Sequence, residues 1–290
     1  MRKGYYFLFA VLVSISPAFA ETTNSLANNN NWTNAVAWSE GHVPTGTETA
    51  EIQAGVTVDG NTTIASDYSG NLILRAGAVL YVLDRDRDYR DFLPSDTNST
   101  ISLYDGAKLY VRYGSIGPMY HPLLIDGAVT IEKGTYYNAN SWSISSVISG
   151  AGSLTWSFFQ DSTHNNREIF FTPASPCTYT GGTTIQNLNS TAQSLRVYAD
   201  GAFGTGDVTI KTASQVVLSG TSDVIDDSAG LYIEGTGILN LGSNSETIHH
   251  CYIDGVKQPD GDYTSAESWL LGSGTLTVEG PPSGTVFTVN

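Results

Sequence analysis

The chain has 290 residues, a formal net charge of −15 and a hydrophobic content of 40%. The acidic balance disfavours binding to nucleic acids and to anionic lipid surfaces. The apolar content excludes a disordered chain, because enough apolar residues are present to build a core. The 30 glycine residues, together with abundant Ser, Thr and Asn, are typical of short strands joined by tight turns.

Residues 1–20 have the pattern of a secretory signal peptide. Arg2 and Lys3 precede an apolar run from Gly4 to Ile15, which is shorter than the ~20 residues that a membrane span needs. The residues Ala18, Phe19 and Ala20 form a small-x-small cleavage site. We therefore expect a mature chain that begins at Glu21, is secreted or held at the outer cell surface, and has no membrane-spanning segment.

Residues 21–49 are predicted to form a polar lead and an N-terminal cap. Trp32 and Trp38 precede a turn that ends at Pro44. The first coil of a stacked repeat has an open apolar end, which large aromatic side chains can cover. The alternative is that the two tryptophans stack on sugar rings.

From Ala50 onward, short segments alternate apolar and polar residues and are separated by glycines. This pattern predicts half-buried strands. Gly–Ala corners recur at Gly77, Gly106, Gly127 and Gly201, each followed by a short strand. We therefore predict an all-β fold, a single-stranded right-handed parallel β-helix (β-solenoid) over residues 50–280. The alternative fold is a β-sandwich, which would show hairpin turns at regular spacing.

Two later segments depart from this pattern. Ser157 to Pro176 is irregular, and we expect a protruding loop or hairpin there. Ile253 to Tyr263 is expected to be a C-terminal hairpin, because Asp254–Gly255 is a strong two-residue turn. Ala266 to Leu270 is expected to form one helical turn, and residues 281–290 a tail or linker.

The residues Tyr179-Thr-Gly-Gly-Thr-Thr-Ile185 and Ala202-Phe-Gly-Thr-Gly-Asp-Val-Thr-Ile210 resemble the autotransporter-associated β-strand repeat of secreted bacterial passenger proteins. The segments from Ile148 to Thr155 and from Leu271 to Val278 are similar to the Gly-x-Gly-x-Leu lead-in of that family. The resemblance covers residues 148–210 well and departs from the family between Phe158 and Pro176. It implies a secreted parallel β-helix and no particular reaction.

An acidic run supplies the candidate metal site. Asp84, Asp86 and Asp88 alternate with arginines in a chain that otherwise has few charges, and carboxylate oxygens suit Ca²⁺. In a polysaccharide lyase these carboxylates with Ca²⁺ would neutralise a uronate, and Arg87 would act as the base. The alternative is a solvated corner loop. His249 and His250 form a second metal candidate, but neighbours in a strand point to opposite faces, which favours a surface pair.

Three further groups of residues are candidates for binding or cross-linking. Tyr104, Tyr110 and Tyr113 would form a glycan-stacking row if they lie side by side on one exposed face. Cys177 and Cys251 are 74 positions apart, so a disulfide would have to join coils that are not adjacent; the alternative is two small buried residues. Asp226 and Asp227 form a carboxylate pair that a turn explains more simply than glycoside hydrolysis.

We expect a non-catalytic β-helix that acts as an adhesin-like or matrix protein, with a polysaccharide or a cell-surface glycan as partner. No cofactor other than Ca²⁺ is expected. The alternative is a carbohydrate-active enzyme on the same scaffold, either a polysaccharide lyase or a glycoside hydrolase. An enzyme would need several carboxylates and a base that converge in one groove.

Overall fold

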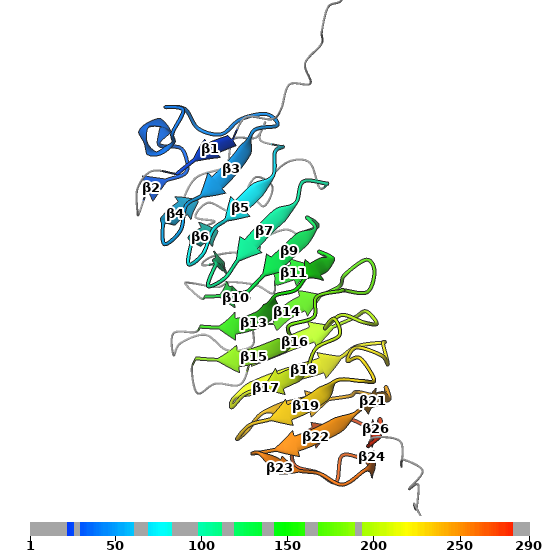
Figure 1. Cartoon of the computed structure of the whole chain (residues 1–290). Helices are drawn as coiled ribbons and strands as arrows, with labels where there is room; N and C mark the ends of the chain where they lie inside the picture. The colour runs from blue at the N-terminus through cyan, green and yellow to red at the C-terminus, as the bar shows by residue number, and fades with distance from the viewer. Residues whose placement is uncertain are drawn as a thin grey trace, which may run out of the picture.

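The computed structural model describes residues 22–25, 30–60, 69–82, 98–111, 119–134, 142–159, 168–188 and 193–280. Within these ranges the chain is all-β with almost no helix, and its strands stack in parallel to form a β-solenoid (Figure 1). The predicted fold class is therefore confirmed. The described helical structure is the short 3-10 turn η1 (Ala35–Ala37), and no described helix has the length and apolar character to cross a membrane.

One sheet, the long sheet, extends through the whole stack. Its 11 strands are, in spatial order, β2 (Asn30–Asn31), β4 (Thr57–Gly60), β6 (Val79–Val82), β8 (Lys108–Val111), β10 (Ala128–Lys133), β13 (Ser153–Phe158), β15 (Thr183–Asn187), β17 (Val208–Ile210), β19 (Gly230–Ile233), β22 (His250–Ile253) and β23 (Val256–Lys257). Neighbouring strands pair in parallel from β2 to β22, whereas β23 runs antiparallel to β22.

Two shorter sheets share the other faces. The N-terminal sheet consists of β1 (Thr22–Asn24), β3 (Thr49–Ile52), β5 (Leu72–Leu74), β7 (Ile101–Tyr104), β9 (Leu123–Asp126) and β12 (Ile148–Gly150). The C-terminal sheet consists of β11 (Trp142–Ile144), β14 (Glu168–Phe171), β16 (Gln193–Val197), β18 (Ser214–Leu218), β20 (Ile238–Asn240) and β25 (Leu270–Leu271). A small sheet of β21 (Glu246–Ile248), β26 (Leu276–Val278) and β24 (Gly261–Tyr263) lies at the C-terminal end (Figure 1).

The core consists of inward side chains that stack directly on one another. Because successive residues of a strand point to opposite faces, one apolar position per strand lines up with the same position of the next strand, ~4.8 Å away. The longest such column in the long sheet is Val58, Leu80, Leu109, Ile131, Trp156, Ile185, Ile210 and Ile233, each at most 2% exposed. Burying each of these side chains contributes about 1.5–3 kcal/mol, so the column stabilises every coil through its neighbours.

The predicted Gly–Ala corners are confirmed where the chain turns between sheets. Gly77, Gly106, Gly127 and Gly201 all have positive φ angles, between 60° and 93°. A side chain is strained in this conformation, whereas glycine adopts it freely. The corners of successive coils also stack closely, since a Cβ atom at Gly106 would lie 3.4 Å from the Cα atom of Gly77.

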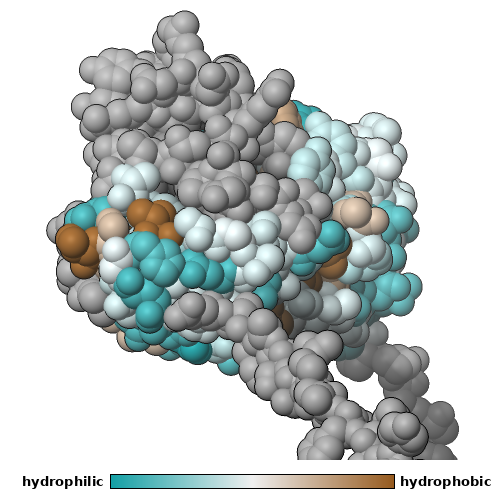
Figure 2. Space-filling model, turned by 90° about the horizontal axis from the view of Figure 1, so that it is seen from above, coloured by the Kyte–Doolittle hydropathy of each residue, from teal (hydrophilic) through white to brown (hydrophobic). Residues whose placement is uncertain are grey.

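The two cap tryptophans are buried at the N-terminal end. Trp32 and Trp38 are 0% and 1% exposed, and their rings meet edge to face at 4.8 Å. The indole Nε1–H of Trp38 donates a hydrogen bond of 2.9 Å to the carbonyl oxygen of Trp32. The rings therefore cover the core and are not available to sugars. Seen from above, the coloured surface of this end is mostly hydrophilic, with small hydrophobic patches (Figure 2).

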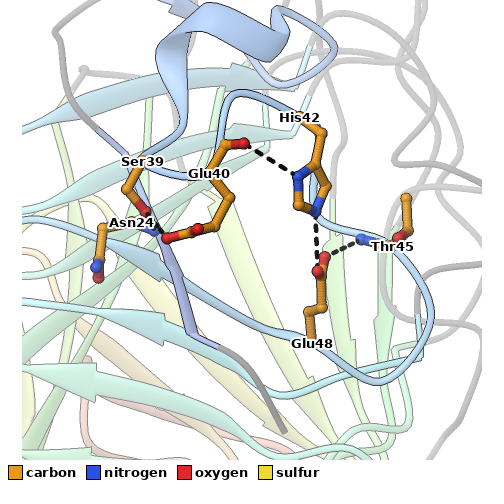
Figure 3. A network of polar contacts seen from close by, with 6 residues as sticks. All are labelled: Asn24, Ser39, Glu40, His42, Thr45 and Glu48. Atoms are coloured by element: carbon orange, nitrogen blue, oxygen red, sulfur yellow. Dashed lines mark hydrogen bonds and ion pairs between the residues drawn. The ribbon is translucent and has the colours of Figure 1, made fainter.

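A polar network holds the loop that follows the tryptophans (Figure 3). The Glu48 carboxylate contacts His42 Nε2 at 2.8 Å and accepts a hydrogen bond of 2.8 Å from the Thr45 backbone N–H. Burial raises the pKa of Glu48, but these two hydrogen bonds outweigh it and hold the pKa below its usual value. Ser39 Oγ accepts a hydrogen bond from the backbone N–H of Asn24, which ties the loop to β1.

The C-terminal hairpin is confirmed, and two other segments differ from the local prediction. Asp254 and Gly255 both have positive φ angles, as the two-residue turn between β22 and β23 requires. Ser157–Pro176 is not only a loop, because it includes β14, where Phe171 is fully buried in register with Ile144. In place of the single helical turn expected over residues 266–270, two successive hydrogen-bonded turns lead into β25, from the Glu267 N–H to the Thr264 carbonyl oxygen and from the Leu270 N–H to the Glu267 carbonyl oxygen.

Candidate functional site

A group of aromatic side chains lies on the outer face of the long sheet, near its C-terminal end. Tyr232 of β19 and Tyr252 of β22 are directly paired in adjacent strands. Their inward neighbours Leu231 and Cys251 belong to the core, so both tyrosines point outward, where they are half-buried. Their rings stack with centroids 5.1 Å apart and planes only 4° from parallel.

His250 links the two tyrosines. Its ring stands nearly perpendicular to both, at 84° to Tyr232 and 85° to Tyr252, and its Nε2 atom lies 3.0 Å from the Tyr232 hydroxyl oxygen. The opposing residue is Gly230, and a Cβ atom there would collide with His250 Nε2. The glycine therefore makes room for the imidazole, while its N–H donates a hydrogen bond of 2.7 Å to Asp207 Oδ1.

His249 joins the same group, against the sequence prediction. It lies in the bend between β21 and β22 rather than in a strand, so the rule of alternating faces does not apply. Its ring centroid is 5.2 Å from that of His250. We call Tyr232, His249, His250 and Tyr252 the tyrosine–histidine cluster. Among the described residues, no three His, Cys, Asp or Glu side chains are arranged to hold a metal ion.

The Tyr232 hydroxyl is the member of the cluster whose ionisation the surroundings change. Burial, with the nearby Asp207 carboxylate and Tyr252, raises the pKa of Tyr232 above its usual value of 10.0. Its hydroxyl group therefore stays protonated and both donates and accepts hydrogen bonds. Together the four side chains offer rings with polar atoms at their tips, held on β19, on β22 and in the bend before β22.

The predicted tyrosine row is divided between two faces of the solenoid. Tyr104 ends β7 of the N-terminal sheet, where the Arg75 guanidinium lies 5.0 Å from its ring centroid. Tyr110 lies on β8 of the long sheet and meets the Tyr81 ring edge to face at 5.0 Å. The corner at Gly106 separates the two strands, and Tyr113 lies outside the described residues. Tyr104 and Tyr110 therefore belong to separate surfaces.

The Arg75 side chain is itself part of a polar ladder across three coils. Its Nη2 atom lies 2.6 Å from Glu51 Oε2, and Gln53 Nε2 donates hydrogen bonds to Glu51 Oε1 and Asn24 Oδ1. The hydrogen bond from Arg75 lowers the pKa of Glu51 below its usual value. One face of Tyr104 is thus occupied by a cation that is already paired.

The acidic run falls outside the described part of the chain. Asp84, Asp86, Arg87 and Asp88 all lie between residues 83 and 97, which the structure does not describe. The calcium site and the lyase chemistry based on these residues stay predictions.

The two cysteines match the interpretation as two small buried residues rather than the disulfide candidate. Cys177 and Cys251 are free thiols, 3% and 0% exposed. Cys251 and Thr183 of β15 occupy the same position in strands of the long sheet that are separated by β17 and β19. They are therefore three strand steps of ~4.8 Å apart. Cys177 belongs to the segment before β15, so it is similarly distant from Cys251. A disulfide needs Cα atoms within ~7 Å. Burial raises the pKa of the two thiols to about 11 and about 12, so both are small buried residues.

Glu246 is a buried acid that sequence reasoning missed. Its side chain is 1% exposed, and its carboxyl oxygens accept hydrogen bonds from the backbone N–H groups of Val224 and Ile225, at 3.0 and 3.4 Å. Burial, with Asp223 and Asp227 nearby, raises its pKa to about 8. Its burial could have been predicted from the sequence. Glu246 is two residues before Ile248 in an alternating strand, so the two side chains point to the same, inward face.

The aspartates beside Glu246 lie at a turn, as the simpler interpretation of Asp226 and Asp227 predicts. Asp226 Oδ1 accepts a hydrogen bond of 2.9 Å from the backbone N–H of Ser228, two residues later. This is a local turn contact. Burial, followed by the charges of Asp227, Asp200 and Asp226, raises the pKa of the neighbouring Asp223 above its usual value.

Comparison with known proteins adds no relatives. No family model, no curated protein and no solved structure matches the chain. The resemblance to the autotransporter-associated repeat thus stays a prediction, and the function has to be inferred from the surface of this β-solenoid.

Proposed function

We propose that this chain is a secreted or cell-surface, non-catalytic β-solenoid that binds glycans through the tyrosine–histidine cluster, as an adhesin-like or matrix protein. The observation that carries the proposal is the parallel Tyr232–Tyr252 pair, half-exposed and linked by His250 on the outer face of the long sheet. A sugar ring has apolar C–H faces and a rim of hydroxyl groups. Aromatic side chains with polar tips match both features.

The surrounding charge favours uncharged or basic glycans. The chain has a formal net charge of −15, and the exposed Asp207 lies beside the cluster. The net negative charge of the chain would repel an acidic polysaccharide. A neutral sugar would meet the hydroxyl and imidazole groups of the cluster, the Asp207 carboxylate and the exposed Lys257, which pairs with Tyr252.

A different observation favours the alternative, a carbohydrate-active enzyme. A carboxyl group with a raised pKa is typical of a general acid, and Glu246 has this property. A general acid must reach the glycosidic oxygen within hydrogen-bonding distance. Glu246 is 1% exposed and is held by two backbone N–H groups, so its environment is that of a structural side chain.

Secretion rests on residues 1–20 and is tested separately. Export of the full chain, with cleavage before Glu21, is expected to release a mature protein whose N-terminal sequence begins Glu-Thr-Thr-Asn. Mass spectrometry of the exported protein measures the cleavage position. Retention of the first 20 residues would refute the signal peptide.

The binding proposal is tested by applying the mature chain to a polysaccharide array, with and without Ca²⁺. We expect binding that weakens about tenfold, equivalent to ~1.4 kcal/mol, in Tyr252→Ala. Tyr198→Ala is the matched control, because Tyr198 is 44% exposed and lies after β16, away from the cluster. Equal weakening in the two variants would refute the assignment of the cluster, and release of shortened sugars from the array would show an enzyme.

A further inference from the structure

A straight row of threonines leads to the tyrosine–histidine cluster. Thr130 pairs with Thr155, Thr155 with Thr184, and Thr184 with Thr209, in four successive strands of the long sheet. We call these four residues the threonine row. Thr209 in turn pairs with Tyr232, so the row ends at the cluster. Figure 1 shows β10, β13, β15, β17, β19 and β22 following one another along the stack.

The four threonine hydroxyls are available to a ligand. All four side chains point outward and are half-buried. Within the described ranges, no hydrogen bond engages any of the four hydroxyl groups, while their backbones take part in the sheet. The positions two residues earlier are small, with Ala128, Ser153 and Gly182 beside the first three threonines. On this side of the row, therefore, the neighbouring side chains are too short to cover the threonine hydroxyls.

The other side of the row is formed by side chains that bind one another. Glu132 lies two residues after Thr130, and its Oε2 atom is 2.9 Å from Lys108 Nζ. Ser157 lies two residues after Thr155 and accepts a hydrogen bond of 3.4 Å from Gln186 Nε2. Glu132 and Ser157 are 6% and 0% exposed, so neither offers its polar group to a ligand, whereas Thr130 and Thr155 are half-buried.

Tyr232 closes one end of the row with an aromatic ring. Tyr252 stacks on one face of this ring, and the opposite face is directed along the stack toward Thr209, the neighbour in the preceding strand. A tyrosine side chain is much longer than a threonine side chain, so the ring stands above the row. A ligand on the row therefore meets hydroxyl groups along its length and an aromatic face at its end.

We propose that the threonine row and the tyrosine–histidine cluster form one linear site for an extended, uncharged polysaccharide chain that lies parallel to the solenoid axis. This proposal rests on the proposed function and specifies its ligand class and binding mode. Hydroxyl groups repeated every ~4.8 Å both donate and accept hydrogen bonds, as sugar hydroxyls do. From Thr130 to Tyr232 the site spans four strand steps, ~19 Å, which is long enough for several sugar units.

Chain-length dependence tests the proposal. Calorimetric titration of the mature chain with linear, neutral β-1,4-linked glucose oligomers, from disaccharide to hexasaccharide, is expected to give affinities that rise with length. The double variant Thr155→Val/Thr184→Val keeps the β-branched shape and removes two hydroxyls. It is expected to bind the hexasaccharide about five- to tenfold more weakly, with little change for the disaccharide. Thr247→Val, in the small sheet, is the matched control.

The outcomes separate the two proposals. Affinity that is independent of length and unaffected by the double variant, but lost in Tyr252→Ala, would overturn the row and support the proposed function. Absence of binding to any oligomer, with binding to the array retained, would overturn the row, and absence of binding in both experiments would overturn both proposals. If wild-type chains self-associate and the double variant does not, the row is an interface between two copies and the polysaccharide site is refuted. Circular dichroism of each variant verifies that the fold is retained.

Discussion

Replacement of Glu246 by glutamine is expected to remove a large part of the pH dependence of folding stability. In the folded chain Glu246 keeps its proton up to a pKa of about 8, whereas an unfolded chain releases it near the usual value of 4.5. Between these two pH values the folded state binds more protons than the unfolded state. The free energy of unfolding therefore falls as pH rises through this window.

The magnitude follows from the size of the shift. Each pKa unit corresponds to ~1.36 kcal/mol, so the shift from 4.5 to about 8 predicts a loss of about 3–5 kcal/mol between pH 4.5 and pH 8. Below pH 4.5 the contribution is fully present. Glutamine has nearly the shape of the protonated acid and does not ionise, so Glu246→Gln should lack this pH-dependent loss. Its amide nitrogen cannot accept one of the two backbone hydrogen bonds, which costs the variant a constant amount of stability at every pH.

Urea denaturation, followed by tryptophan fluorescence at several pH values from 5 to 8, measures this difference. The unfolding midpoint of the wild type should fall relative to that of Glu246→Gln as pH rises from 5 to 8, on top of a constant offset from the lost hydrogen bond. Glu234→Gln is the control, because the Glu234 side chain is exposed on the turn after β19, and its curve should follow the wild type. Parallel curves for wild type and Glu246→Gln would refute the assignment of a buried, protonated carboxyl.

Three other perturbations probe the core, a corner and the thiols. Ile185→Ala, which removes a fully buried side chain from the central column, should lower the free energy of unfolding by about 2–5 kcal/mol in urea denaturation; a loss below ~1 kcal/mol would contradict the stacked core. Gly150→Ala should lower the melting temperature much more than a Gly→Ala change at an exposed position. Gly150 has a φ of 116°, and a Cβ atom there would collide with the carbonyl oxygen of Ile125. An unchanged melting temperature would contradict this geometry. Cys177 and Cys251 should react with a thiol reagent only after unfolding, because both are buried and have raised pKa values. In denaturant without reducing agent, two thiols should be detected. Detection of none would indicate a disulfide.

The fold was predictable because its determinants are local. Glycines such as Gly106 mark corners that need a positive φ angle, and alternation of apolar residues identifies strands such as β8 and β19. The hairpin turn at Asp254–Gly255 was predictable for the same reason. The strand β14 was missed because the surrounding residues carry no regular alternation, and its placement depends on pairing with β11 and β16.

The candidate site was not predictable, because it depends on register between distant strands. Tyr232 and Tyr252 are 20 positions apart, and nothing in the sequence shows that they pair directly. The same holds for the threonine row, whose members come from four different coils. Conversely, Tyr104 and Tyr110 are close in sequence, but a single corner places them on different sheets. Sequence proximity therefore predicts surface proximity poorly in a solenoid.

The antiparallel strand β23 limits how this protein can join others. A parallel stack grows when another strand adds in the same direction, but the last hydrogen-bonding edge of β22 is already taken by a strand of opposite direction. Parallel addition of a strand of a further subunit directly to β22 would first have to displace the hairpin. The length of the rod is consequently set by the number of coils, and duplicating one internal coil would lengthen it by ~4.8 Å while leaving both ends intact.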